Sequence, residues 1–230
     1  MPNQSQAHTA QSSKLLAQLA RLGAPATSDA LPCFAERLSR LFGLGDTMTL
    51  DAATAHRARQ PGSVQGAMVD KLTDELATTR RALVRRIQGW ADELEFDDEP
   101  ELEPVLNAWL ALQRKVAANS RQLRDKVRKS MKDQGQNLAR LAELDAVFDH
   151  TMASFTSQGF SSLLQVLEQR FQQLQTSPEQ HQASGQAPND NWFHRYCEDA
   201  QALLLAELDV RLEPVLGLLE ACHNEVNNTP

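Results

Sequence analysis

The sequence predicts an all-α protein: a long antiparallel helical hairpin, coiled-coil-like, with short N-terminal helices and a kinked C-terminal helix packed against it as a bundle. Its 230 residues include 33 Leu and 30 Ala but only 11 Val and one Ile, and aromatic residues make up 5%. Strands favour β-branched and aromatic side chains, whereas Leu and Ala favour helices. Apolar residues also recur at spacings of three, four and seven, which indicates amphipathic helices.

The predicted organisation is one helical domain behind a tail. Polar, Pro- and Gly-containing stretches separate the periodic segments and set their boundaries. The predicted parts are a disordered tail (1–12) and a single all-helical domain (13–226), which comprises a short-helix cluster (13–58), the long hairpin with a short helix (63–176), a flexible loop (177–190) and the C-terminal helix (191–226).

Three short helices are expected near the N-terminus. The first is capped by Ser13 and ended by Gly23. The second begins at Ser28 or Asp29 and ends before Gly43. The third, between residues 45 and 55, has Thr47 or Thr49 as its cap.

The first arm of the hairpin is predicted as one helix of about eight turns. Its apolar residues recur at fours and sevens from Val64 to Leu94. An acidic bend over residues 92–103 follows, with eight carboxylates and no Lys or Arg. Pro104 suits the first turn of the next helix.

The second arm carries a seven-residue repeat from Pro104 to Phe155. One row of this seam contains Leu106, Gln113, Ser120, Val127, Gln134, Leu141, Phe148 and Phe155, and the companion row contains Leu110, Ala117, Arg124, Met131, Leu138, Asp145 and Met152. Polar residues weaken the middle of the seam, and Gly135 lowers helix propensity, so a kink near residues 132–136 is one alternative to a continuous helix.

The last two helices follow two breaks. Gly159 is expected to end the second arm before a short amphipathic helix that reaches Leu174. Residues 177–188 contain Pro and Gly but no large apolar residue and therefore predict a loop. The C-terminal helix starts at Trp192, and Pro214 should kink it.

Basic residues gather in two stretches, which a hairpin could bring together. The candidate interaction patch contains Arg80, Arg81, Arg85, Arg86, Arg114, Lys115, Arg121, Arg124, Lys126, Arg128, Lys129 and Lys132. It could bind nucleic acid, anionic lipid or an acidic partner, or be a solvated face neutralised by the acidic bend. The net charge of −7 and the lack of interleaved aromatic residues argue against nucleic acid.

The sequence offers little for metal binding or catalysis. His194 and Cys197 share a helical face and His223 adjoins Cys222, but core packing explains them better than a four-ligand site. His194, Cys197 and Glu198 would have to line an enclosed pocket to support an enzyme. No phosphate-binding glycine loop occurs, so we expect no activity, no cofactor and no metal.

Cysteine usage and hydropathy bear on location. Cys33, Cys197 and Cys222 form an odd, sparse set that indicates a reducing cytoplasm. No window approaches 18 consecutive apolar residues and no export signal is recognisable, so no transmembrane segment is expected. The polar positions of the seam leave homo-oligomerisation, or docking onto another coiled coil, open as alternatives.

Three blocks resemble an uncharacterised proteobacterial family, a domain of unknown function of about this length. They are FAERLSRLFGLGDTMTLDAA (34–53), LAELDAVF (141–148) and WFHRYCEDAQALLLAELDVRLEPVLGLLEA (192–221), and the similarity extends from about Leu15 to Cys222. The resemblance implies no activity or site residues. Members of that family are often encoded beside membrane proteins resembling MotA/MotB or OmpA-type components, and the resemblance therefore implies a cytoplasmic accessory of an envelope complex.

The predicted function is therefore that of a non-enzymatic interaction or scaffold protein with protein partners. The resemblance adds that it serves as a cytoplasmic accessory of an envelope-associated complex, peripheral to the inner membrane. A nucleic-acid-associated protein using the same bases is the alternative, and a small enzyme is the third.

Overall fold

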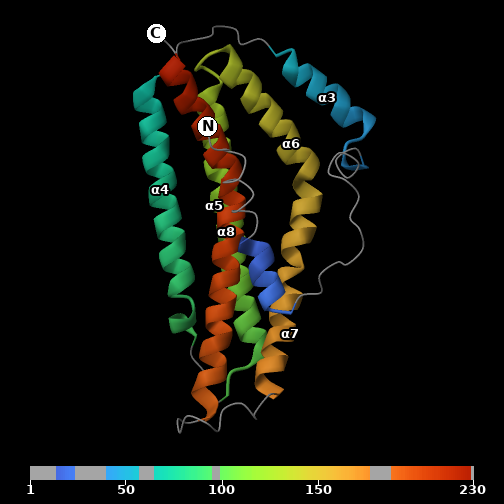
Figure 1. Ribbon diagram of the computed structural model, residues 1–230, viewed down its shortest axis with the longest axis vertical. Helices are drawn as coiled ribbons and strands as arrows, with labels where there is room; N and C mark the ends of the chain where they lie inside the picture. The colour runs from blue at the N-terminus through green and yellow to red at the C-terminus, as the bar shows by residue number, and fades with distance from the viewer. Residues whose placement is uncertain (1–13, 24–39, 57–64, 95–98, 177–187, 229–230) are drawn as a thin grey trace, which may run out of the picture. The chain divides into compact units, whose positions relative to one another are not determined.

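A computed structural model describes residues 14–23, 40–56, 65–94, 99–176 and 188–228 of the chain, with side chains from residue 192 in the last range (Figure 1). Within these ranges the regular structure is helical and contains no strand, which confirms the predicted all-α bundle. The principal elements are α3 (Leu44–Thr54), α4 (Gly66–Gln88), the 3-10 turn η1 (Ala91–Glu93), α5 (Leu102–Met131), α6 (Gln136–Ser161), α7 (Leu163–Thr176) and α8 (Pro188–Asn228). Residues 14–21 form a further short helix.

The chain divides into two compact units, each assembled from three stretches of sequence. Unit 1 comprises Met1–Ala26, Arg81–Ala118 and Gly159–Arg211. Unit 2 comprises Thr27–Arg80, Asn119–Gln158 and Leu212–Pro230. Helices α4, α5, α6 and α8 contribute residues to both units, so neither unit is a continuous piece of chain.

In unit 1 the core lies among α5, α7 and the first part of α8. Trp109 of α5 is fully buried, and its indole Nε1 donates a hydrogen bond to the carbonyl oxygen of Ala200 at 3.2 Å. Phe171 of α7 packs edge-on against Trp192 and Tyr196 of α8, with ring centroids 5.1 and 5.2 Å apart. Large aromatic side chains thus fix α8 against its neighbours in this unit.

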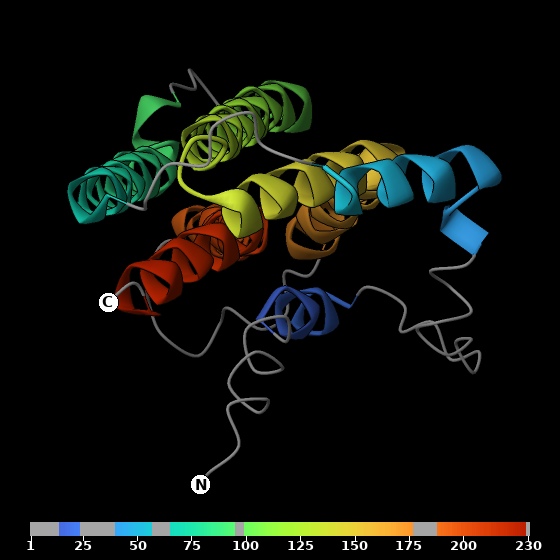
Figure 2. The same cartoon turned by 90° about the horizontal axis from the view of Figure 1, so that it is seen from above.

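In unit 2 the apolar core contains Leu72, Val127, Met131 and Leu212, which are 2% exposed or less. The short helix α3 lies along α6 (Figure 2). The carboxylate of Asp46 accepts a hydrogen bond from the hydroxyl of Thr151 at 2.9 Å, and a second from the backbone N–H of Gly43 at 2.9 Å. Asp46 therefore supports the start of α3, where the sequence had predicted Thr47 or Thr49; Thr47 instead donates to the Gly43 carbonyl oxygen.

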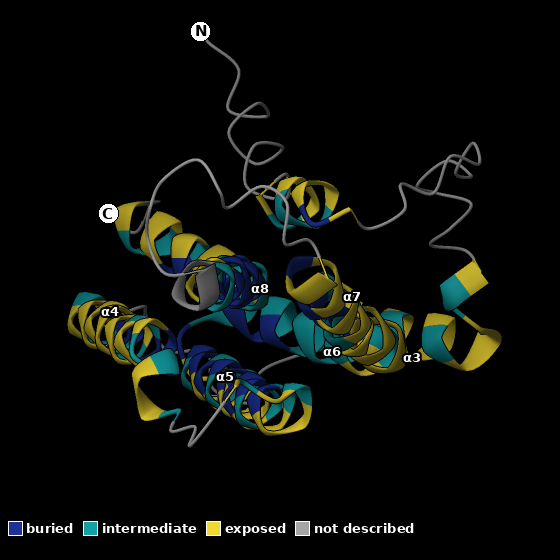
Figure 3. Cartoon of the chain, turned by 90° about the horizontal axis from the view of Figure 1, so that it is seen from below, coloured by how far each residue is buried: buried dark blue, intermediate teal, exposed yellow. Residues whose placement is uncertain are grey.

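The buried face of α5 is offset from the predicted seam. Gln113, Ser120, Val127 and Gln134 of the first row are buried as predicted. In the companion row Met131 and Leu138 are buried as predicted, whereas Leu110, Ala117 and Arg124 are only partly buried and their neighbours Trp109, Val116 and Leu123 take the buried positions. Phe148 and Phe155 of the first row are exposed, contrary to the prediction. Figure 3 shows the resulting division of α5 and α8 into buried and exposed faces.

The second arm of the hairpin is two helices, not one. Helix α5 ends at Met131 and α6 begins at Gln136. Gly135 between them has a φ of 118°, a conformation that residues with a Cβ rarely adopt. The kink that the sequence offered as an alternative is a complete break, and the continuous helix is wrong.

Three other boundaries differ from prediction. Helix α4 ends at Gln88, before the predicted Leu94, and α6 passes through Gly159 to end at Ser161. Helix α8 begins at Pro188, within the predicted loop 177–190. Helix α8 continues through Pro214, where the predicted kink stays a prediction. The tail 1–12, most of the second short helix and most of the loop 177–190 lie outside the described residues.

None of the described helices combines the length and the apolar character needed to cross a bilayer.

Candidate interaction surface

The twelve predicted basic residues separate into two groups with different surroundings. Four of them, Arg124, Lys126, Arg128 and Lys132, pair with carboxylates of unit 2. Arg80 and Lys115 are exposed and interact with other residues. The remaining six are exposed and form no ion pair with another described residue: Arg81, Arg85, Arg86 and Arg114 in unit 1, and Arg121 and Lys129 in unit 2.

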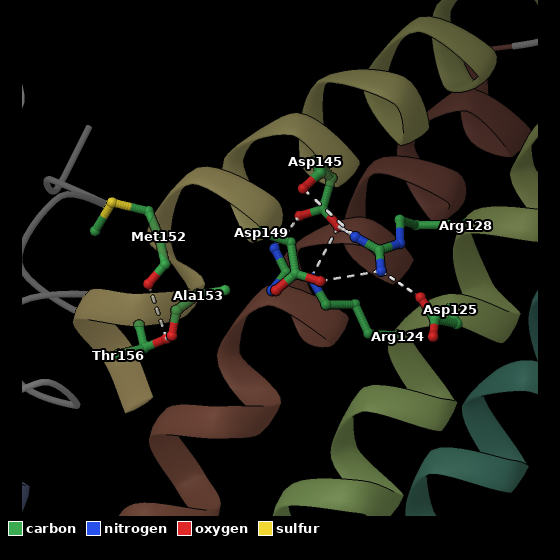
Figure 4. Close-up of polar contacts among 8 residues, drawn as sticks. All are labelled: Arg124, Asp125, Arg128, Asp145, Asp149, Met152, Ala153 and Thr156. Atoms are coloured by element: carbon green, nitrogen blue, oxygen red, sulfur yellow. Dashed lines mark hydrogen bonds and ion pairs between the residues drawn. The ribbon is translucent and has the colours of Figure 1, made fainter. Parts of the chain in front are cut away.

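An ion-pair network joins the end of α5 to α6 (Figure 4). The Nε and Nη2 of Arg124 donate to the two oxygens of Asp145 at 2.8 and 2.6 Å, and its Nη1 donates to Asp149 at 2.6 Å. Arg128 donates to Asp125, Asp145 and Asp149. Such bidentate pairing orients both partners and is stronger than a single exposed pair.

The network changes the interpretation of these two arginines. Arg128 is only 9% exposed. Burial alone would lower the pKa of its guanidinium, but the hydrogen bonds that it donates to Asp125 and Asp149 outweigh this effect and raise the pKa. Arg124 and Arg128 therefore hold the α5–α6 corner together and are not available as free cations.

Two lysines are likewise neutralised within unit 2. Lys126 pairs with Glu75 of α4 at 2.6 Å, and Lys132 pairs with Glu143 of α6 at 2.6 Å. The acids that pair with these four bases come from α4, α5 and α6. None of them belongs to the acidic bend, which the sequence offered as one possible source of neutralising charge.

In unit 1 one of these bases, Arg86, lines a pocket of about 300 Å³. Helix α4, η1 and α5 form it. Its lining consists of Arg86, Trp90, Glu93, Leu94, Ala108, Ala111, Leu112 and Lys115. Apolar side chains thus make most of the wall, while Arg86 and Lys115 supply positive charge and Glu93 one negative charge.

Trp90 lines this pocket and is itself buried. The residue is 5% exposed, and its indole Nε1 has no hydrogen-bond acceptor among the described residues. A buried N–H without an acceptor costs about 1–3 kcal/mol, so Trp90 occupies this position at a cost in stability.

The pocket was not predicted, although the sequence contains its signals. Ala108 and Ala111 are small residues one turn apart on α5, beside the larger Leu112. Helix α4 ends at Gln88, and Trp90 lies just beyond it, before η1. Small residues facing a bulky one at a helix end are a pattern that leaves space between elements.

The candidate metal and catalytic residues are not assembled into a site. His194 and Glu198 are 75% and 64% exposed and lie 3.5 Å apart, whereas Cys197 is buried. Burial raises the pKa of the Cys197 thiol to about 12 and that of Cys222 to about 11. Among the residues that the structure describes, no three His, Cys, Asp or Glu side chains are grouped to hold a metal ion.

A buried polar cluster in unit 1 was also missed. Glu207 is 0% exposed, and its carboxylate accepts hydrogen bonds from Gln113 at 2.8 Å and Arg211 at 2.6 Å. Gln113 also donates to the Phe160 carbonyl oxygen at 3.1 Å, and the Arg211 guanidinium lies 3.9 Å from the centre of the Phe160 ring. The polar residue that weakened the seam is therefore a partner for a buried acid.

The chain was compared with models of known protein families, with curated proteins and with solved structures. Residues 1–224 match the model of a protein family of unknown function, DUF3348. The chain belongs to this DUF3348 family. No curated protein and no solved structure matches it. The match confirms the resemblance drawn from the three sequence blocks, and the unit-1 pocket and the ion-pair network are features of a DUF3348 protein.

Proposed function

We propose that this DUF3348 protein is a non-enzymatic interaction protein, and that the unit-1 pocket binds an acidic segment of a partner protein with one apolar anchor side chain. The observation that carries the proposal is the combination of an apolar wall with unpaired bases. Arg86 lines the pocket, while Arg81, Arg85 and Arg114 are exposed on the same two helices.

The chemistry of such a partner follows from the lining. Leu94, Leu112 and the indole of Trp90 favour an apolar side chain of the partner, since burying it removes apolar surface from water. Arg86 and the exposed arginines favour carboxylates beside that anchor and would speed encounter with an acidic segment. Aromatic anchors surrounded by charged residues are common where a few residues dominate binding.

The expected location of this partner comes from the family resemblance. Members of that family are encoded beside membrane proteins, which supports an envelope-associated assembly as the source of the partner. The protein would then act on the cytoplasmic side. A nucleic acid is the alternative ligand for the same unpaired bases, and the experiment below separates the two.

The test is a pull-down of the tagged full chain from native lysate at low and moderate salt, with and without nuclease. The variant R81E/R85E/R114E reverses three exposed charges that form no ion pair with other described residues. The matched control K71E/R121E/K129E reverses three exposed charges in unit 2. We expect the control to retain a nuclease-resistant acidic partner and the unit-1 variant to lose it.

Photo-crosslinking locates the contact. A photoreactive residue in place of Ala111, which is exposed and lines the pocket, should crosslink the partner, whereas one at the exposed Gln172 of α7 should not. Loss of every companion after nuclease treatment, with steep weakening by salt, would instead assign the bases to nucleic acid. Equal loss in both charge-reversal variants would contradict the pocket as the docking site.

A further inference from the structure

A second pocket in unit 1 brings three arginines together from three helices. Its volume is about 470 Å³. Arg21 comes from the short helix 14–21, Arg170 from α7 and Arg195 from α8. The complete lining is Arg21, Arg170, Arg195, Glu198, Asp199 and Gln201, all of them polar or charged.

Asp199 holds two of the three guanidinium groups in place. Its side chain is 8% exposed. One carboxylate oxygen accepts a hydrogen bond from Arg21 Nη2 at 2.7 Å, and the other accepts one from Arg170 Nε at 2.8 Å. Both oxygens of Asp199 are thus engaged, and both arginines are oriented by the same carboxylate.

Most N–H donors of Arg21 and Arg170 have no acceptor among the residues that the structure describes. A guanidinium carries five N–H donors, and each of the two gives only one to Asp199. The Nη atoms of Arg170 have no acceptor among the described residues, although the side chain is only 17% exposed. Fixed donors without acceptors in a partly buried position suit a ligand with several oxygen atoms.

Arg195 supplies the third cation. It lies one helical turn before Asp199 on α8, is exposed, and forms no ion pair with another described residue. Three positive and two negative side chains line the pocket. Because Asp199 is already shared by Arg21 and Arg170, and Glu198 is 64% exposed and 3.5 Å from His194, an anion entering the pocket meets an excess of positive charge.

We propose that this pocket binds a small hydrophilic molecule that carries a phosphate group. A tetrahedral phosphate presents oxygens in several directions and can accept from three guanidinium groups at once, whereas a carboxylate presents two coplanar oxygens. The volume exceeds that of a phosphate alone and the lining has no apolar side chain, so the rest of the ligand is polar, as in a sugar phosphate.

Isothermal titration calorimetry of the full chain at fixed ionic strength tests the proposal. The probes are inorganic phosphate, pyrophosphate, glucose 6-phosphate and succinate. We expect saturable binding of the phosphate compounds and weaker binding of succinate. Tighter binding of succinate would overturn the phosphate assignment, and no binding of any phosphate probe would overturn the site.

Variants separate the site from general positive charge. Arg195→Gln removes a cation that has no described partner, so folding should be unaffected, and binding should weaken about ten- to hundredfold. Arg170→Lys keeps the positive charge but loses the planar guanidinium with its several N–H donors, and it should weaken binding about tenfold or more. Arg85→Gln, an exposed arginine of unit 1 outside this pocket, is the control, and weakening equal to that of Arg195→Gln would contradict the proposal.

Discussion

Glu207 is the most deeply buried charged side chain that the structure describes. Desolvation raises its pKa, and this effect outweighs the opposing influence of Arg211 and Gln113, both of which stabilise the carboxylate. A group whose pKa is higher in the folded than in the unfolded state takes up a proton on folding. Its contribution to stability is fully present below the unfolded value, ordinarily 4.5, and is lost as the pH rises through the folded value.

Glu207→Gln should therefore change the pH dependence of stability. The amide keeps the shape and a hydrogen-bond acceptor but cannot titrate. Lowering the pH from 7 towards 4.5 should increase the free energy of unfolding of the wild type relative to E207Q, as measured by urea denaturation at several pH values. Glu168→Gln, at an exposed position of α7, is the control and should show no such trend. If the free energies of unfolding of the wild type and E207Q differed by the same amount at every pH, the raised pKa of Glu207 would be contradicted.

Ser120 of α5 has a buried hydroxyl without a hydrogen-bond partner among the described residues. The residue is 4% exposed, and its Oγ has no hydrogen-bond partner among the described residues. Ser120→Ala removes an unsatisfied polar group and should raise the free energy of unfolding by about 1 kcal/mol. Chemical denaturation measures the change.

The matched control is Ser154→Ala, which makes the same substitution at an exposed position of α6. It should show only the gain in helix propensity, roughly 0.5 kcal/mol. If S120A stabilised no more than S154A, the hydroxyl of Ser120 would have to find a partner in solution.

Polar residues within a heptad row are where prediction from sequence was weakest. The row through Gln113, Ser120 and Gln134 was correctly placed on the buried face, because a period of seven fixes the face of a helix. Its partners were not predictable: Gln113 meets Glu207, and Gln134 accepts a hydrogen bond from the backbone N–H of Gln65 at 2.8 Å. These contacts join residues 94 and 69 positions apart, and periodicity within one helix contains no information about them.

At the scale of elements, composition and periodicity predicted the helices well and their ends less well. Gly23 ends the first helix with a φ of 77°, and Pro104 lies in the first turn of α5, as predicted. The break between α5 and α6 was offered only as an alternative, since a single Gly is tolerated in many helices. What decides it is the network of Arg124 and Arg128 with Asp145 and Asp149, which holds the two helices together across the corner.

Gly135→Ala tests that corner. At a φ of 118° an added Cβ is strained, so the free energy of unfolding should fall by about 1–2 kcal/mol. Gly159→Ala is the matched control: Gly159 lies within α6, and a Cβ there would meet no atom within 4 Å. That substitution should stabilise the protein by about 1 kcal/mol. Thermal unfolding followed by circular dichroism compares the two variants. If both substitutions changed the free energy of unfolding in the same direction, the backbone conformation of Gly135 would be contradicted.

At the scale of the whole molecule, four helices contribute residues to both units: α4, α5, α8 and, with its last three residues, α6. The three tryptophans, Trp90, Trp109 and Trp192, all belong to unit 1, whereas far-ultraviolet circular dichroism reports every helix. Because α4, α5 and α8 contribute to both units and helix formation is cooperative, we expect a single unfolding transition. The G135A change in unit 2 should then shift the tryptophan fluorescence midpoint as far as the circular dichroism midpoint. A fluorescence midpoint that stayed in place would show that the units unfold separately.

The candidate sites were only partly predictable at this scale. The sequence identified the basic residues, but not which of them have acidic partners, since Asp145 lies 21 residues from Arg124 and Glu75 lies 51 residues from Lys126. The cluster of Arg21, Arg170 and Asp199 spans 178 positions of sequence. Only tertiary packing distinguishes a free arginine from a structural one.

The reactivity of the two buried cysteines reports the opening of each unit separately. Cys197 lies in unit 1 and Cys222 in unit 2. Only a thiolate attacks a disulfide reagent, and burial holds both thiols in the protonated form at neutral pH. In a Cys33→Ser background, the rate at which each remaining thiol reacts therefore measures how often its own unit opens, and a mutation or ligand that protects one thiol but not the other reveals which unit it stabilises.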